Sequence, residues 1–225
     1  RFNDQGTLLA TGDAGGRVCV WHCATGELLH TLLGANTGET AVAFSPNNQW
    51  LASATVDGTV FLWALPSGTL RQTWRGHNEE VAALAFALDG TVLATGSNDT
   101  TVGLWSVADG QLLHRLAGHT QPVRDLATSA SSQLLVSGGG NPFVYVWDMA
   151  SGQALHILSS HASALDRFSI SPDGRTMATI DLNDVVSLWD IQRGLRVNAY
   201  PIYRSVIWAL AFHPAGERMV TGGAD

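Results

Sequence analysis

Histidine has the widest chemistry of any residue type in this chain, and eight histidines occur among its 225 residues. An imidazole can bind zinc or act as a general base, but either role needs several groups that converge on one point. The histidines instead form two sets, each with at most one member per repeat, and two histidines stand alone. The first set is His77, His119 and His161, the second is His30, His114 and His156, and the single residues are His22 and His213. The sequence therefore predicts no metal site and no cofactor.

Motifs of the common enzyme classes are absent as well. The chain contains no H-E-x-x-H, no G-x-S-x-G and no G-x-G-x-x-G that opens a helix. All 12 basic residues are arginine, so no lysine is available for a phosphate loop, a Schiff base or a kinase ATP site. The formal net charge of -7 disfavours nucleic acid, whose phosphates require a concentrated positive face. We expect no enzyme active site, no nucleic-acid partner and no small-molecule substrate.

The two cysteines and the lack of targeting segments bear on the compartment. Along an extended segment Cys19 and Cys23 are roughly 13 Å apart, too far for a disulfide, and their spacing is not that of a zinc pair. We therefore predict reduced thiols. The segment Arg1–Gly16 lacks the apolar core of a signal peptide, and Leu126–Trp147 is interrupted by Ser, Gly, Asn and Pro. We predict a cytoplasmic protein that does not enter a membrane.

A repeat of 42 residues organises the sequence. Three independent registers share this spacing, which makes an internal repeat the first conclusion to draw. The registers are a tryptophan at 21, 63, 105, 147 and 189, a glycine at 26, 68, 110, 152 and 194, and a Ser or Thr at 11, 53, 95, 137, 179 and 221.

Each repeat contains four short apolar segments separated by turn residues. In the repeat that starts at His77 the expected strands are 81–86, 92–97, 102–105 and 112–116, and turn sequences such as Leu88-Asp89-Gly90 separate them. No segment has a helical period long enough to compete. Because a four-stranded sheet cannot bury both faces by itself, neighbouring repeats must stack face to face. Stacking around an axis also protects the sheet edges.

Gly-His and Trp-Asp pairs at fixed places in the repeats give the chain its resemblance to a known family. The pairs are Gly76-His77, Gly118-His119, Trp147-Asp148 and Trp189-Asp190, with Ser160-His161 as a variant. With these pairs the chain resembles the WD40-repeat β-propellers along its whole length. The resemblance implies an all-β fold of four-stranded antiparallel blades in an incomplete ring, about five blades of seven. It also implies that residues 1–225 are a single propeller domain and a fragment of a longer protein.

The resemblance further implies a hydrogen-bonded tetrad of His, Ser or Thr, turn Asp and Trp in each blade. One repeat has all four residue types, and the others depart from the set. The implied tetrad residues are His77, Thr95, Asp99 and Trp105; His119, Ser137, Asn141 and Trp147; His161, Thr179, Asn183 and Trp189; and Ser53, Asp57 and Trp63, with Ala35 in place of the His. We expect the Trp63 and Trp21 blades to be the softer ones, by about 1–2 kcal/mol for each buried hydrogen bond that is missing.

One position near the start of the innermost strand varies strongly between repeats. It is occupied by Thr40, Ala82, Arg124, Asp166 and Trp208 in successive repeats, and Asp125 and Arg167 follow two of these. The reversed charges of Arg124 beside Asp166 and of Asp125 beside Arg167 fit either an ion pair between blades or a polar rim that grips a peptide. Trp208 lies near Tyr203 and Arg204, a combination typical of binding hot spots, but it could equally pack on a blade outside this chain.

The function that fits these patterns is a non-catalytic scaffold that binds a protein or peptide, with Arg124, Asp166, Trp208, Tyr203 and Arg204 as candidate contact residues. A second hypothesis is a sensor or regulatory domain attached to an NTPase or kinase encoded elsewhere in the parent protein. A third, an enzyme site at the propeller axis, would need polar groups on innermost strands that are mostly Ala, Val, Leu and Phe. A rival to the incomplete ring is a five-blade closure in which residues 206–212 complete the first blade.

Overall fold

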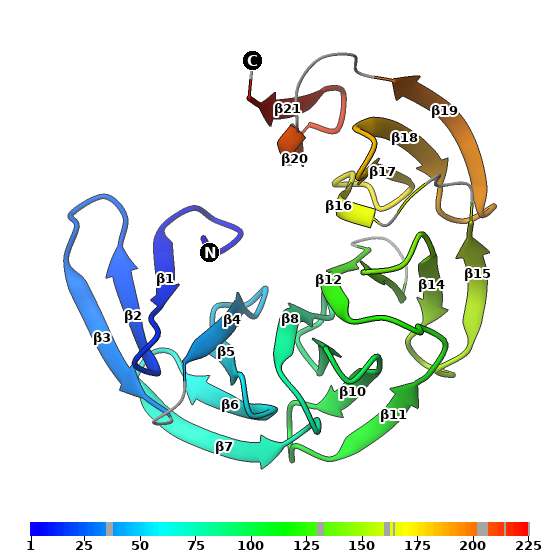
Figure 1. The fold of residues 1–225 in the computed structure, drawn as a ribbon. Coiled ribbons are helices and arrows are strands. Elements are labelled where there is room, and N and C mark those ends of the chain that lie inside the picture. The colour runs from blue at the N-terminus through cyan, green and yellow to red at the C-terminus, as the bar shows by residue number, and fades with distance from the viewer. Residues whose placement is uncertain are drawn as a thin grey trace. The chain divides into compact units, whose positions relative to one another are not determined.

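The computed structural model describes residues 1–34, 38–129, 133–159, 163, 165–201, 207–213 and 215–224, and gives only the backbone of residues 39, 40, 166 and 208. Every regular element in these residues is a β-strand, and strands pair antiparallel with their neighbours in sequence (Figure 1). The chain divides into two compact units, Arg1–Gly118 and His119–Asp225. We refer to each sheet as a blade and number the blades along the chain; the first to fifth contain Trp21, Trp63, Trp105, Trp147 and Trp189.

The first unit contains three blades. The first has three strands and the next two have four each, in the sheet orders β1-β2-β3, β4-β5-β6-β7 and β8-β9-β10-β11. Their bounds are β1 Leu8–Gly12, β2 Arg17–His22, β3 Leu28–Leu33, β4 Glu39–Phe44, β5 Trp50–Thr55, β6 Thr59–Ala64, β7 Thr69–Arg75, β8 Val81–Phe86, β9 Val92–Ser97, β10 Val102–Ser106 and β11 Leu112–Leu116. Within this unit β1 lies beside β4 and β4 beside β8 (Figure 1). The inner strands are β4 and β8, and the outer strands are β3, β7 and β11. Strand β1 corresponds to β5, the strand next to the inner one.

The second unit contains two four-stranded blades and a pair of strands, in the orders β12-β13-β14-β15, β16-β17-β18-β19 and β20-β21. Their bounds are β12 Val123–Thr128, β13 Leu134–Gly139, β14 Val144–Asp148, β15 Ala154–Leu158, β16 Leu165–Ile170, β17 Thr176–Asp181, β18 Val185–Asp190, β19 Leu195–Pro201, β20 Ile207–Phe212 and β21 Met219–Gly223. Here β12, β16 and β20 are the inner strands, and β12 contacts β16 as β16 contacts β20.

This strand content confirms the predicted all-β fold of four-stranded antiparallel blades and its incompleteness. The chain forms four complete blades, while the first lacks an inner strand of full length. Only Phe2 of the first repeat makes an inner-strand bridge, to Leu9. Strand β20 pairs with β21 in the sixth repeat.

The apolar core forms where blades stack. The second strand of each complete blade is buried along nearly its whole length. In β5 this is because sheets of the first unit cover both of its faces. One buried cluster joins Leu62 and Val60 of the second blade to Val81 and Phe86 of the third. The outer strands instead expose apolar side chains on their free edge.

Two irregularities recur in every complete blade. The inner strand carries a β-bulge, so that in β8 Val81 pairs with Ser97 and Ala83 with Gly96 while Ala82 is left unpaired. The same shift leaves out residues 40, 124, 166 and 208. A second shift falls on the outer strand opposite the repeated tryptophan. Because a bulge turns its side chain away from the regular strand pattern, the position that varies most between repeats is also the one the backbone presents differently.

Candidate functional site

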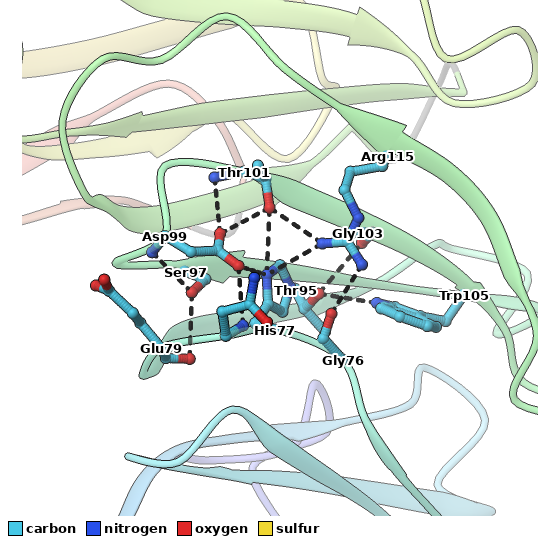
Figure 2. Close-up of polar contacts among 11 residues, drawn as sticks. Gly76, His77, Glu79, Thr95, Ser97, Asp99, Thr101, Gly103, Trp105 and Arg115 are labelled. Carbon is cyan, nitrogen blue, oxygen red and sulfur yellow. Dashed lines mark hydrogen bonds and ion pairs between the residues drawn. The ribbon is translucent and has the colours of Figure 1, made fainter.

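The third blade contains the complete hydrogen-bonded set. The Trp105 indole nitrogen donates to Thr95 Oγ1 at 2.8 Å, Thr95 Oγ1 lies 2.6 Å from His77 Nε2, and His77 Nδ1 lies 2.9 Å from Asp99 Oδ2 (Figure 2). An indole can only donate and a carboxylate can only accept, so the Thr95 hydroxyl donates to Nε2 and Nδ1 carries the imidazole proton. The set therefore links β9, β10, the turn between them and the β7–β8 loop into one polar chain within the blade.

The turn of the second blade fixes the position of His77. The Gly58 carbonyl accepts hydrogen bonds from the backbone N–H groups of Gly76 at 2.9 Å and of His77 at 3.2 Å. Gly58 has a φ of +87°, and a Cβ at this residue would lie 2.3 Å from the His77 carbonyl oxygen. Only glycine permits both the backbone conformation and this close approach. Gly58, in the turn after β5, thus fixes the position of the His77 imidazole in the next blade.

Arg115 extends this network toward solvent. Its guanidinium donates to the Gly76 carbonyl at 2.8 Å and to Thr101 Oγ1 at 3.1 Å, and lies 5.8 Å from the centre of the Trp105 ring (Figure 2). Thr101 in turn donates to Asp99 at 2.7 Å. A cavity of about 370 Å³ opens beside these groups, between Arg75, Arg115 and the tetrad. Arg115 is thus a further member of the set that the sequence analysis missed.

The electrostatics of the third blade keep its imidazole neutral. Burial lowers the pKa of His77, which is 3% exposed, and the Asp99 carboxylate opposes this shift without overcoming it. Burial raises the pKa of Asp99, but hydrogen bonds from Thr101 and the interactions with His77 outweigh it and hold that pKa below its usual range. A neutral imidazole with both nitrogens engaged and no open coordination position has a structural role.

The fourth blade repeats the arrangement with one weaker link. The Trp147 indole donates to Ser137 Oγ at 2.8 Å, and Ser137 Oγ lies 2.8 Å from His119 Nε2. Asn141 Oδ1 lies 3.3 Å from His119 Nδ1, and Asn141 Nδ2 is buried with no hydrogen-bond partner in the described part of the chain. Burial lowers the pKa of His119. An amide thus takes the place of the carboxylate and adds one unsatisfied N–H group.

The second and fifth blades contain parts of the set. In the second, the Trp63 indole donates to Ser53 Oγ at 3.1 Å, while Asp57 is exposed and accepts from Thr55 Oγ1 at 2.7 Å. Position 35, the place of the histidine, lies outside the described residues.

In the fifth blade the Trp189 indole donates to Thr179 Oγ1 at 2.9 Å, and Asn183 is exposed, with its backbone N–H donating to Asp181 Oδ1 at 2.9 Å. His161 also lies outside the described residues. In both of these blades the described part of the set is therefore the bond from tryptophan to hydroxyl.

In the outer-strand register of His30, His114 and His156, His30 and His156 contact the next blade of their own unit. His156 Nε2 lies 2.9 Å from the Gln192 carbonyl in the next blade, and at the same repeat position Gln72 donates to the Ala108 carbonyl at 2.9 Å. Both carbonyls belong to the turn that carries the repeated glycine. A Cβ at Gly68 would lie 2.5 Å from His30 Nδ1, so close packing between blades requires glycine there. His30 of the outer-strand register in the first blade thus packs against Gly68, the repeated glycine of the second blade.

Among the candidate contact residues Arg124 is the best described. It is the bulged residue of β12, and its side chain is exposed. The neighbouring Asp125 accepts a hydrogen bond from the backbone N–H of Phe168 in β16, at 3.5 Å. Arg167 is exposed on the same strand as Phe168. These charged residues of the fourth and fifth blades therefore lie on adjoining inner strands.

The other candidate contact residues are Asp166, Trp208, Tyr203 and Arg204. Asp166 and Trp208 are described by their backbone, which places each at the bulge of its inner strand, β16 and β20. Tyr203 and Arg204 lie outside the described residues. The grouping of these four with Arg124 thus stays a prediction.

Within the described ranges no group of three or more His, Cys, Asp or Glu side chains is placed to hold a metal ion. No helix with the length and apolar character needed to cross a membrane occurs in the same ranges.

Comparisons with known proteins give a family and a structural neighbour. The family model described as the IFT122 first beta-propeller matches residues 39–225. Among curated proteins no relative matches the sequence. The crystal structure of the computationally designed Ika8 protein is similar to this chain, with a TM-score of 0.85 and 29% sequence identity over 97% of this chain and 65% of the designed one. The chain thus spans slightly less than two thirds of the length of that protein.

Proposed function

The chain belongs to the family of the first β-propeller of IFT122, and on this premise we propose that it is a non-catalytic scaffold that binds a protein or peptide partner. The observation that carries the proposal is the bulge shared by the inner strands. The repeated tryptophan, glycine and Ser/Thr positions keep their residue type, whereas the bulged position changes from Thr to Ala, Arg, Asp and Trp. A position that has the same backbone bulge in each repeat but a different side chain is suited to the recognition of a partner.

Charge and exposure support Arg124 as the centre of this surface. Its side chain is exposed, and Arg167 is exposed on the adjoining strand. Arginine and tryptophan are the residues most enriched among those that dominate binding energy. We propose that Arg124, Asp166 and Trp208, with Tyr203 and Arg204 beside Trp208, contact the partner. No small-molecule substrate, nucleic acid or membrane is part of this proposal.

The test uses a peptide selected from a displayed library on the purified chain. Its affinity for Arg124→Ala, Asp166→Ala and Trp208→Ala is measured by fluorescence anisotropy. Each change should weaken binding by about tenfold or more, as expected for residues at the centre of an interface. Arg175→Ala, which removes an exposed arginine from the turn before β17, is the matched control and should bind like the wild type. Wild-type affinity in all three variants would show that the surface is wrongly assigned.

Two further properties belong to the same proposal. We propose that residues 1–225 act as one propeller domain, supported by a 42-residue register that runs from Trp105 to Trp147 across the division at Gly118–His119. We also propose a cytoplasmic location. Its support is that Cys19 and Cys23 are free thiols, as expected of a reducing compartment.

A further inference from the structure

An apolar pocket of about 390 Å³ lies between the first and second blades of the first unit. Its lining is Leu8 and Val20 from the first blade, Leu29 and His30 from the outer strand β3, Asn48 from the β4–β5 turn, and Leu65 and Pro66 from the β6–β7 turn. The floor includes Val20 and Leu65, which are 1% and 5% exposed. Aspartate, glutamate and arginine are absent from the lining, so the pocket suits an uncharged apolar group.

The repeat itself indicates which group is missing. Leu8 occupies the position held by Trp50 in the second blade, since the two residues are 42 apart and both begin the strand next to the inner one. Trp50 packs against the buried cluster that contains Leu62 and Val107. Those two residues correspond to Val20 and Leu65 of the pocket. The pocket is therefore found where the first blade has a leucine and the second supplies an indole.

The surface beside the pocket favours an extended chain as the source of that group. Strand β3 is the outer edge of its sheet and pairs with β2 on one side. Its apolar side chains Leu28, Leu29 and Leu33 are 44%, 39% and 73% exposed. A free edge offers backbone hydrogen bonds to an added segment, and an adjacent pocket selects one of its side chains. A small free ligand would use the pocket and leave this apolar edge uncovered.

The polar atoms of the lining favour indole over phenyl. Asn48 Oδ1 accepts one hydrogen bond, from Asn3 Nδ2 at 3.1 Å. A carbonyl oxygen has two lone pairs, so this atom can accept a second donor. An indole offers an N–H at the end of a large apolar surface, whereas a phenyl ring offers none.

We propose that this pocket receives one aromatic side chain, tryptophan before phenylalanine, from an extended segment of a partner protein. The inference rests on the proposed scaffold function and gives it a second contact site, on the outer side of the first two blades. The Arg124 surface and this pocket share no residue.

The test follows chemical shifts of the isotope-labelled chain during titration with the peptide acetyl-Ser-Gly-Trp-Gly-Ser-amide. Peptides with Phe or Ala in the central position are titrated in parallel. We expect saturable shifts in β3 and around Leu8 with a Kd of about 1 mM for the Trp peptide, about threefold weaker binding for Phe, and none for Ala. Equal shifts with the Trp and Ala peptides, or no shifts with any peptide, would overturn the proposal.

Two variants and one matched control locate the binding. Leu8→Trp supplies the indole from the chain itself, as Trp50 does in the next blade, and should weaken binding at least about tenfold. Leu29→Asp charges the rim and should weaken it similarly. Leu113→Asp is the matched control, because Leu113 holds the same repeat position in the third blade and is 46% exposed. Wild-type affinity in both Leu8→Trp and Leu29→Asp, or an equal loss in Leu113→Asp, would refute the assignment.

Other occupants give different results in the same experiments. Binding of N-acetyl-tryptophanamide without binding of the peptide would mean a small-molecule pocket and would contradict a partner segment. Self-association of the wild type that Leu8→Trp abolishes, measured by analytical ultracentrifugation, would identify a second copy instead and also contradict it. Arg124→Ala should leave the affinity for the Trp peptide unchanged. Failure of the Trp peptide therefore rejects the pocket alone, while wild-type binding in the Arg124, Asp166 and Trp208 variants rejects the inner-strand surface alone.

Discussion

The hydroxyl of Thr95 offers the sharpest test of how the blades are held together. Thr95→Val keeps the shape of the side chain and removes the oxygen, which is fully buried. The change leaves two buried groups without partners, the Trp105 indole N–H at 2.8 Å and His77 Nε2 at 2.6 Å. Each unsatisfied buried polar group costs about 1–3 kcal/mol, so the loss of partners for two groups should destabilise the third blade by about 2–6 kcal/mol.

The other blades supply a graded series of the same change. Ser53→Ala leaves one buried group without a partner, the Trp63 indole N–H, and should cost about 1–3 kcal/mol. Thr11→Val affects the Trp21 indole, whose partner Thr11 is exposed, so water replaces the lost bond and the cost should stay below about 1 kcal/mol. The predicted order is set by the number of buried groups left without a partner.

Native-state hydrogen exchange with mass spectrometry is the assay, because it measures opening free energies blade by blade where global unfolding of a repeat protein need not be two-state. Amides of β9 and β10 report on Thr95→Val, and those of β5 and β6 on Ser53→Ala. The reasoning fails if Thr95→Val and Ser53→Ala differ by less than about 0.5 kcal/mol, or if Thr11→Val costs as much as either.

Two further predictions concern pH and contacts between blades. Burial lowers the pKa values of His77 and His119, so the unfolded chain takes up protons first as pH falls. Stability is therefore complete above about pH 6.5 and declines below it by up to about 1.4 kcal/mol per pH unit for each histidine. Urea unfolding at several pH values measures the slope, and an unchanged slope in His77→Gln would contradict it. Gly68 has a φ of +65°, and a Cβ there would lie 2.5 Å from His30 Nδ1, so Gly68→Ala should cost about 1–3 kcal/mol. His30→Ala should recover part of this loss in a double-mutant cycle, and strictly additive effects would show that the two residues do not interact.

Much of the fold could be predicted from the sequence because its determinants are local. The expected strands 81–86, 92–97 and 112–116 have the bounds of β8, β9 and β11, and the third strand extends by one residue to Ser106. Turn residues and apolar runs act over a few positions, and a 42-residue repeat states them several times. The same repetition predicts a first blade without its full inner strand and a sixth repeat with two strands.

The candidate sites could be predicted only in part, because a site depends on which residues of different strands meet. His77, Thr95, Asp99 and Trp105 follow from the family pattern. Arg115 does not, although its register offers a signal, since Thr31, Thr73, Ile157 and Ala199 hold that position in other repeats. The exposed cation reaches the Gly76 carbonyl and the Trp105 ring, 39 and 10 residues away, through folding alone.

What the sequence alone determined is the repeat, the class of fold and the residues that every blade must keep, since these follow from short-range pattern and its recurrence. The tertiary structure decided where the residues that differ between repeats lie and what they contact. It placed Arg124 on a bulge, turned His156 and Gln72 toward carbonyls of the next blade, and left a pocket where Leu8 replaces a tryptophan. The contacts of His156 and Gln72 and the pocket bring together residues that are remote in sequence, and the packing of one blade on the next sets the distances between them.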